Sequence, residues 1–160
     1  MCGLTGFWCP EGLDSESIKD RALAMNVCLR HRGPDDQGIW LDSGHGIAMA
    51  HSRLSIIDLS DAGSQPMLSE SGRYVLVFNG EVYNHIALRT HLEKMTTLSW
   101  RGKSDTETLL TAIEQLGVEK AVKLCIGMFA FAVWDRRRTE LTLCRDRLGE
   151  KPLFYGWQNG

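Results

Sequence analysis

The sequence predicts a single α+β domain in which helices pack on layers of β-sheet. Three observations lead to this prediction. The chain has 160 residues, is 43% hydrophobic and carries a net charge of −2, which is typical of a globular domain with a real core. Short apolar segments bounded by turn residues indicate strands, and other segments carry apolar residues at helical spacing. No internal repeat or low-complexity linker divides the chain.

Six apolar segments are expected to be strands. The segment Gly3 to Trp8 is short and stops before Pro10, which is typical of a buried strand. Residues 129–133 are apolar at every position, so we expect that strand to be covered on both faces. The expected strands are residues 3–8, 37–41, 46–51, 74–78, 128–134 and 141–144. A charged turn that contains three consecutive arginines, residues 136–138, joins the last two.

Three helices are expected from their capping residues. The first begins at a cap in residues 14–15 and ends at 33–34, where glycine and proline follow each other. The second begins after Asn84, and the third begins with the capping box at 104–107 and ends at Gly117. Their apolar faces are Ile18, Ala22, Met25 and Leu29; Leu88, Leu92 and Met95; and Leu109, Ile113 and Leu116.

Charge and cysteine content exclude several classes of protein. The 18 basic and 20 acidic residues are mixed along the chain, so no basic face indicates nucleic-acid binding. No segment approaches the roughly 18 apolar residues of a membrane span, and no signal peptide is evident, so the expected location is the cytoplasm. Five scattered cysteines without a C-x-x-C pair disfavour a disulfide framework and a zinc site. The five histidines lack metal-ligand spacing, and no phosphate-binding loop is present.

The first two residues, Met1 and Cys2, allow a catalytic interpretation. Removal of Met1 leaves a thiol and a free α-amine on one residue. Such an amine titrates near ~8 and can act as a base beside a thiol that titrates near ~8.5. These two residues alone favour the simpler alternative, a small apolar residue that opens a strand. The other motifs of the chain are needed to distinguish the catalytic from the structural interpretation of Cys2.

Three other positions also have a structural and a functional interpretation. Asn79-Gly80 is a strong hairpin-turn signal, and it also brings an amide and a backbone N–H to one place, as an oxyanion hole requires. Asp105 lies in the first turn of a helix, where it either interacts with the helix dipole or binds a substrate ammonium group. Arg53 is either a surface residue or a bidentate carboxylate clamp, and spacing alone favours the surface.

Eight ordered motifs, taken together, resemble the glutamine amidotransferase domain of the N-terminal nucleophile type, which begins with a catalytic cysteine. They are residues 1–6, 30–35, 51–58, 65–67, 78–84, 104–107, 127–131 and 145–149. The wording Arg-His-Arg-Gly-Pro-Asp at 30–35 and Asn-Gly-Glu-Val-Tyr-Asn at 79–84 is similar to the glutamine-hydrolysing asparagine synthetases. Sugar-phosphate and purine-pathway amidotransferases are the weaker match.

The resemblance implies a four-layer αββα N-terminal nucleophile hydrolase fold, here expected to lack its last strands. It also implies that Cys2, after removal of Met1, attacks the side-chain amide of L-glutamine. The other implied roles are an oxyanion hole from Asn79 and Gly80, a carboxylate clamp from Arg53, ammonium contacts from Asp105 and Glu81, and a pocket wall from the backbone of Leu54, Ser55, Ile56 and Ile57. No metal or organic cofactor is expected for this half-reaction.

The resemblance also implies partners that this chain does not contain. In asparagine synthetases a larger domain uses ATP and magnesium to activate aspartate and receives ammonia through a tunnel. We expect residues 1–160 to be one glutamine amidotransferase domain, with that synthetase domain in cis on a longer protein or, less favoured, on a partner chain in trans. A homodimer of the full enzyme fits the same expectation, and we expect the isolated piece to be poorly stable because of an open sheet edge. A different ammonia acceptor and a non-catalytic binding module are the alternatives.

Overall fold

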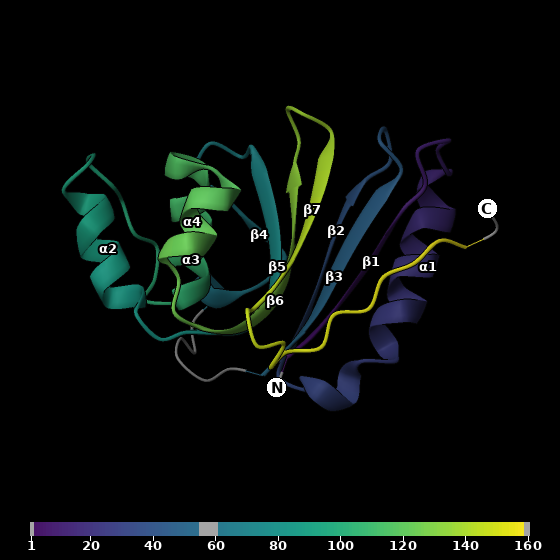
Figure 1. Cartoon of the computed structure of the whole chain (residues 1–160). Helices are drawn as coiled ribbons and strands as arrows, with labels where there is room; N and C mark the ends of the chain where they lie inside the picture. The colour runs from purple at the N-terminus through teal and green to yellow at the C-terminus, as the bar shows by residue number, and fades with distance from the viewer. Residues whose placement is uncertain (1, 55–60, 159–160) are drawn as a thin grey trace.

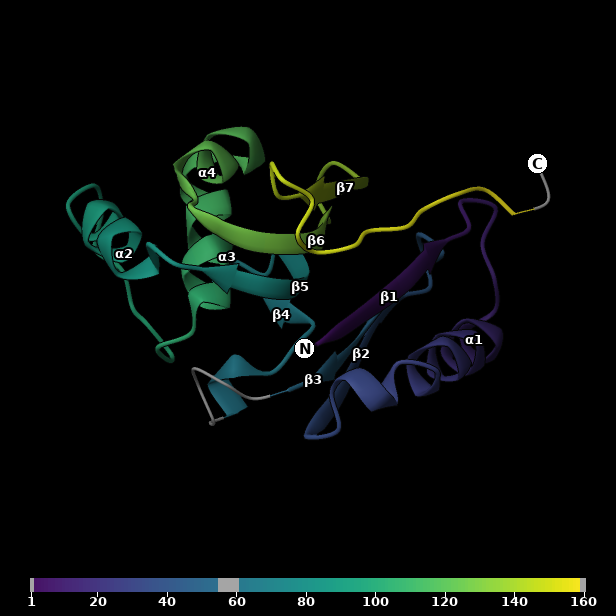
Figure 2. The same cartoon turned by 60° about the horizontal axis from the view of Figure 1, so that its bottom comes forward.

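The computed structural model describes residues 2–54 and 61–158 and has four layers, two antiparallel sheets with helices on the outer face of each (Figure 1). The layers follow the order helices, four-stranded sheet, three-stranded sheet and helix, as the view in Figure 2 also shows. This arrangement confirms the expected α+β class and the αββα order of layers. In the described part of the chain no helix is long and apolar enough to cross a membrane.

The three-stranded sheet contains β1 (Gly3–Trp8), β2 (Asp36–Asp42) and β3 (Ile47–Arg53) in the order β1-β3-β2. Helix α1 (Ser15–Val27) covers its outer face, where Ile18 and Ala22 pack against Ala48. The side chain of Asp14 caps this helix by accepting hydrogen bonds from the N–H groups of residues 16 and 17. The helix ends at Val27 rather than near residue 33, and a short 3₁₀ helix, η1 (Arg30–Arg32), follows it.

The four-stranded sheet contains β4 (Met67–Leu68), β5 (Tyr74–Val82), β6 (Gly127–Asp135) and β7 (Glu140–Arg145), in that order. A second short 3₁₀ helix, η2 (Asp61–Gly63), precedes β4. The outer face of this sheet carries α2 (His85–Glu93), α3 (Asp105–Leu116) and α4 (Val118–Leu124). Neither the two-residue strand β4 nor the helix α4 was expected from the sequence.

Strand β6 is buried on both faces, as its continuous apolar sequence predicts. Phe129, Phe131 and Val133 face the helices and belong to the core between α2–α4 and the sheet. Ala132 and Trp134 point the other way, into the core between the two sheets. The charged turn after β6 is exposed at residues 136–138, as expected.

Two details of the helix predictions are wrong. Asn84 precedes α2, but its side chain does not cap the helix; it donates to the Leu124 carbonyl and accepts from the Ile126 N–H instead. Met95 lies beyond the end of α2 and is 54% exposed, so it does not belong to the inner face. At α3 the cap itself is confirmed, because the Ser104 hydroxyl accepts from the Glu107 N–H at 3.2 Å.

Candidate active site

The candidate site lies where the layer between the two sheets changes from apolar to polar. Alternate residues of a strand share one face, so the inward positions can be read in order along β3 and β5. They are Ile47, Met49, His51 and Arg53 on β3 and Val75, Val77, Asn79 and Glu81 on β5. The first two positions of each strand belong to the core between the sheets. The later positions approach or line a pocket at one end of this layer.

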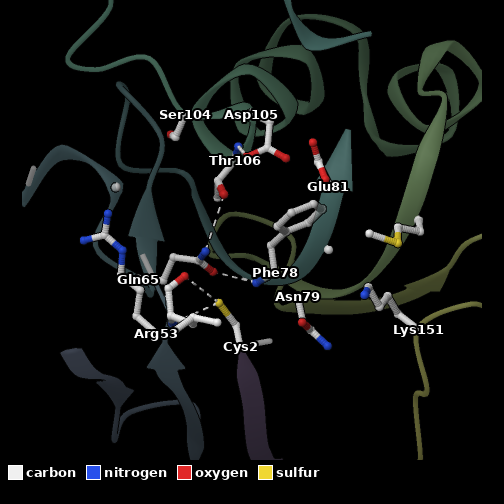
Figure 3. A pocket seen from close by; sticks show the side chains of 14 residues that line it. Cys2, Arg53, Gln65, Phe78, Asn79, Glu81, Ser104, Asp105, Thr106 and Lys151 are labelled. Atoms are coloured by element: carbon white, nitrogen blue, oxygen red, sulfur yellow. Dashed lines mark hydrogen bonds between the residues drawn. The ribbon is translucent and has the colours of Figure 1, made fainter. Parts of the chain in front are cut away.

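The pocket brings together most of the residues that the sequence singled out. It has a volume of about 130 Å³ and is shown in Figure 3. Seven predicted site residues line it: Cys2, Arg53, Leu54, Asn79, Gly80, Glu81 and Asp105. The other three, Ser55, Ile56 and Ile57, lie outside the described residues. The predicted positions therefore come from the start of β1, the end of β3, β5 and α3, which are far apart in the sequence.

Cys2 lies immediately before β1 and is held against the end of β3. Because Gly3 pairs with Ser52 in an antiparallel register, Cys2 follows opposite Arg53, one residue before Leu54. The Leu54 N–H donates to the Cys2 Sγ at 3.3 Å, and the thiol lies 3.6 Å from the Leu54 carbonyl. The Arg32 side chain donates to the Cys2 carbonyl at 3.2 Å. The thiol is thus partly buried in the pocket rather than packed as an apolar residue inside a strand.

Asn79 and Gly80 lie inside β5, so the predicted hairpin turn is wrong. The pairing of β5 with β6 continues through both residues, and Gly80 is opposite Phe129. Gly80 has a φ of 155°, and a Cβ at this position would lie 2.1 Å from the Met128 carbonyl oxygen. Glycine is therefore required because β6 approaches too closely for any side chain. The long-range strand pairing overrides the local turn preference.

The edge of β5 that faces away from β6 presents a row of N–H groups. The Phe78 N–H donates to the Gln65 Oε1 at 2.6 Å, and the Val82 N–H donates to the Asp105 Oδ2 at 2.8 Å. By the period of two, the Gly80 N–H lies on this same edge between them, at the pocket. Side chains occupy the two outer donors. The middle donor belongs to Gly80, which lines the same pocket as Asn79 and Cys2.

Charged side chains line the pocket walls and are deeply buried. Arg53 is 7% exposed, so the surface interpretation that its spacing favoured is wrong; its guanidinium donates to the Ser64 hydroxyl at 3.4 Å. Asp105 is 5% exposed, and its burial raises the pKa of its carboxyl group. Asp105 also accepts from the Thr106 N–H at 2.9 Å at the start of α3. One pocket thus holds a buried cation and a buried carboxylate.

The sequence prediction missed several residues that line the same pocket. They are Gly63, Gln65, Phe78, Ser104, Thr106, Met128 and Lys151. Gln65 and Lys151 are polar and only 7% and 6% exposed. Gln65 lies in the motif at residues 65–67, which supports the family resemblance, but the sequence assigned no role to it. Lys151 reaches the pocket through a loop in which the Asp146 carboxylate accepts backbone N–H groups, including that of Lys151 at 3.1 Å.

His51 is the one buried histidine among the five, which were expected to be structural or solvated. Its Nε2 lies 3.1 Å from the Phe78 carbonyl oxygen, and its Nδ1 has no hydrogen-bond partner. Burial lowers the pKa of His51 to about 4, so the ring is neutral near pH 7 and donates from Nε2. Within the described residues no group of three or more potential ligands is placed to hold a metal ion.

Comparison with known proteins places the chain in a family. A family model described as a glutamine amidotransferase domain matches residues 1–160. A putative glutamine-hydrolysing asparagine synthetase 2 of Methanocaldococcus jannaschii is 35% identical, covering 98% of this chain and 32% of that protein. Asparagine synthetase B of Escherichia coli is 37% identical (98% and 27% covered), and amidase chry2 of Gibberella zeae is 34% identical (97% and 24%). The chain spans about a third or less of the length of these relatives.

A solved structure supports the fold. It is the glutamine phosphoribosylpyrophosphate amidotransferase of Bacillus subtilis in complex with ADP and GMP. The two structures superpose with a TM-score of 0.69 over 89% of this chain and 37% of that one, at 20% sequence identity. At this identity the likeness concerns the fold alone. The family model covers the chain from end to end, and we conclude that the chain belongs to the glutamine amidotransferase domain family.

Proposed function

We propose that this domain hydrolyses L-glutamine to glutamate and ammonia, with Cys2 as the nucleophile. The observation that carries the proposal is that Cys2, Asn79 and Gly80 line the same pocket. The Gly80 N–H lies between two donors of the β5 edge that are already occupied. Acyl transfer requires a nucleophile together with hydrogen-bond donors for the oxyanion, and a thiol, an amide side chain and a backbone N–H in one pocket can supply both.

The charged walls of the pocket fit the fixed end of glutamine. A free amino acid carries one α-carboxylate and one α-ammonium group, and the pocket offers Arg53 for the first and Asp105 with Glu81 for the second. Leu54 lines the same pocket. Binding of this end places the side-chain amide at the thiol, and such positioning can supply several kcal/mol of the barrier.

The reaction then needs only groups of the chain itself. After removal of Met1, the free α-amine of Cys2 takes the thiol proton, and the thiolate attacks the amide carbon while the electron pair moves to the oxygen. Asn79 and the Gly80 N–H stabilise this oxyanion. The oxyanion collapses, the C–N bond breaks, and the α-ammonium group gives its proton to the departing ammonia. Water then attacks the resulting thioester and releases glutamate and the thiol.

We assign the ammonia to an acceptor outside this domain. Relatives named glutamine-hydrolysing asparagine synthetases are about three to four times longer than this chain, which supports aspartate, activated with ATP and magnesium, as the acceptor. The ATP-dependent part would belong to the same longer protein or to a partner chain. Amidase chry2 of Gibberella zeae matches almost equally well, so a different acceptor is the second candidate. A non-catalytic module is disfavoured because the nucleophile, clamp and donors are all present.

Replacement of the nucleophile tests the proposal and has the largest expected effect of all the variants considered. In Cys2→Ala, glutamate release from glutamine should fall by at least about 10⁴-fold, because the thioester cannot form. Cys28→Ala is the matched control, since Cys28 is an exposed cysteine at the C-terminal end of α1. It should retain wild-type rates. Persistence of activity in Cys2→Ala would reassign the nucleophile.

The acceptor is tested separately. The full protein should form asparagine from glutamine, aspartate, ATP and magnesium, as detected by amino-acid analysis. If it instead consumes glutamine without forming asparagine under these conditions, the glutaminase proposal stands and aspartate is excluded as the acceptor.

A further inference from the structure

The free edge of β5 is held by side chains instead of by another strand. Among the described residues, β4 pairs with β5 at Leu76 and Val75, and no strand of this part of the chain pairs with that side of β5 further toward Val82. An unpaired edge leaves backbone groups without partners and is free to twist. Here the side chains of Gln65 and Asp105, which are buried and polar, accept hydrogen bonds from the N–H groups of Phe78 and Val82. The position of Gly80, between these two points, depends on how firmly they are held.

Gln65 binds the Phe78 N–H through one end of its side-chain amide and Thr106 through the other. Its Oε1 accepts from the Phe78 N–H at 2.6 Å, and its Nε2 donates to the Thr106 hydroxyl at 3.4 Å, as Figure 3 shows. The Gln65 backbone is itself seated on the other sheet, because a Cβ on Gly38 would lie 1.9 Å from the Gln65 carbonyl oxygen. Gln65 thus connects β2 of one sheet to β5 of the other.

Thr106, the hydrogen-bond partner of Gln65, connects it to the Asp105 carboxylate that binds the Val82 N–H. Thr106 follows Asp105 in the first turn of α3, and its N–H donates to the Asp105 Oδ1 at 2.9 Å. The other oxygen of the same carboxylate accepts from the Val82 N–H at 2.8 Å. The chain of contacts from Gln65 through Thr106 to Asp105 therefore spans the edge of β5 on both sides of Gly80.

The Phe78 peptide is fixed from its carbonyl side as well. His51, on the central strand of the other sheet, donates to the Phe78 carbonyl at 3.1 Å. The N–H and the C=O of the residue directly before Asn79 are thus both bound by buried side chains. Neither Gln65 nor His51 has a part in the chemistry proposed above.

We propose that Gln65 is a positioning residue for the oxyanion hole: by holding the Phe78 N–H and the Thr106 hydroxyl, it fixes the β5 edge so that the Asn79 amide and the Gly80 N–H converge on the bound amide oxygen. This inference rests on the proposed glutaminase function. Gln65 acts through β5, so its loss should affect the oxyanion more than the bound ground state. A displacement of about 1 Å in such a site reduces catalysis by on the order of 10²-fold.

Gln65→Leu in the full protein tests this role. The change keeps the approximate volume and removes both hydrogen bonds. We expect kcat for glutamine hydrolysis to fall by about tenfold to a hundredfold while KM stays within about threefold. The matched control is Gln115→Leu, the same change at an exposed position of α3, which should leave both parameters at the wild-type value.

Two inhibitors separate a positioning role from a general disturbance of the pocket. The γ-aldehyde of glutamate forms a hemithioacetal: the C–S bond to Cys2 forms, and the carbonyl electron pair moves onto the oxygen, which then occupies the oxyanion hole. Glutamate binds the same pocket without that oxygen. In Gln65→Leu the affinity for the aldehyde should fall by at least about tenfold, and that for glutamate should stay within about threefold.

A second variant covers the case in which Gln65→Leu does not fold, as judged by its thermal transition. Thr106→Val removes the hydroxyl partner and keeps the backbone bond to Asp105, so it should show the same selective loss at about threefold to tenfold. Equal losses for the aldehyde and glutamate, or an unchanged kcat, would overturn the positioning role while leaving the glutaminase intact. A wild-type protein that releases no glutamate from glutamine would overturn both proposals.

Discussion

The layer between the two sheets has an apolar half and a polar half, and both are built on the same two strands. On β5 the inward residues Val75 and Val77 are almost fully buried among aliphatic and aromatic neighbours, whereas the next inward residue, Asn79, lines the pocket. On β3 the change occurs between Met49 and His51. Both strands continue through this boundary. Consecutive inward residues, two positions apart on one strand, therefore belong first to the hydrophobic core and then to the polar half of the layer.

The two halves contribute differently to the free energy of unfolding. Burial of aliphatic side chains in the apolar half stabilises the fold, at roughly 25 cal/mol for each Å² removed from water. In the polar half, Arg53 and Asp105 are almost as deeply buried, and such groups are destabilising unless they are hydrogen-bonded. We therefore expect substitutions in the apolar half to change stability and substitutions in the polar half to change catalysis.

Asn79→Ala should have the largest effect in the polar half outside the nucleophile. Loss of one oxyanion donor lowers kcat by about 10²–10³-fold, which corresponds to roughly 2.7–4 kcal/mol of activation free energy. Steady-state glutamate release measures it, and KM for glutamine should change little because the donor acts mainly in the transition state. A variant with unchanged kcat would show that Asn79 is not part of the oxyanion hole.

His51, at the boundary between the halves, should make stability depend on pH. Its pKa is about 4 in the folded protein against 6.5 as its ordinary value, so between these limits the unfolded chain binds more protons. Stability from this residue is therefore complete above pH 6.5 and is lost as the pH falls toward 4, by roughly 3 kcal/mol. Denaturant unfolding across this range measures the slope.

His51→Gln should flatten that slope, and His91→Gln, at an exposed position of α2, should leave it at the wild-type value. Equal slopes in the wild type and in His51→Gln would mean that the buried ring does not stay neutral.

Val77→Ala should have the smallest of these effects and the opposite character to Asn79→Ala. It removes two methyl groups from a position that is 1% exposed, which should lower the free energy of unfolding by about 2 kcal/mol. The folded variant should keep the wild-type kcat, as measured below its thermal transition. A catalytic defect comparable to that of Asn79→Ala would contradict the division into two halves.

Residue patterns predicted six of the seven described strands and three of the four α-helices, because hydrophobic period and capping act locally. The buried strand β6 and the cap at Ser104 are examples. The predictions are wrong where contacts between segments far apart in the sequence determine the structure. Asn79-Gly80 is a turn by local rules, but nine residues of β5 pair with β6 and keep it extended. Helix α4 is only 7 residues long, too short for a clear period.

The candidate site was predictable only in part for the same reason. Cys2 and Asp105 could be named because each has a local chemical reason, a terminal amine or a helix start. Arg53 looked like a surface residue because nothing in its neighbourhood in the sequence shows that two sheets enclose it. Gln65 and Lys151 reach the pocket from loops whose positions depend on tertiary contacts, so no spacing rule assigns them.

The most direct test of the central claim is mass spectrometry of the protein quenched with acid during turnover of isotope-labelled glutamine. We expect the labelled γ-glutamyl group as a thioester on the N-terminal peptide, with Met1 absent and the label on Cys2. A retained Met1, or a label on another residue, would contradict the assignment of Cys2 as an N-terminal nucleophile.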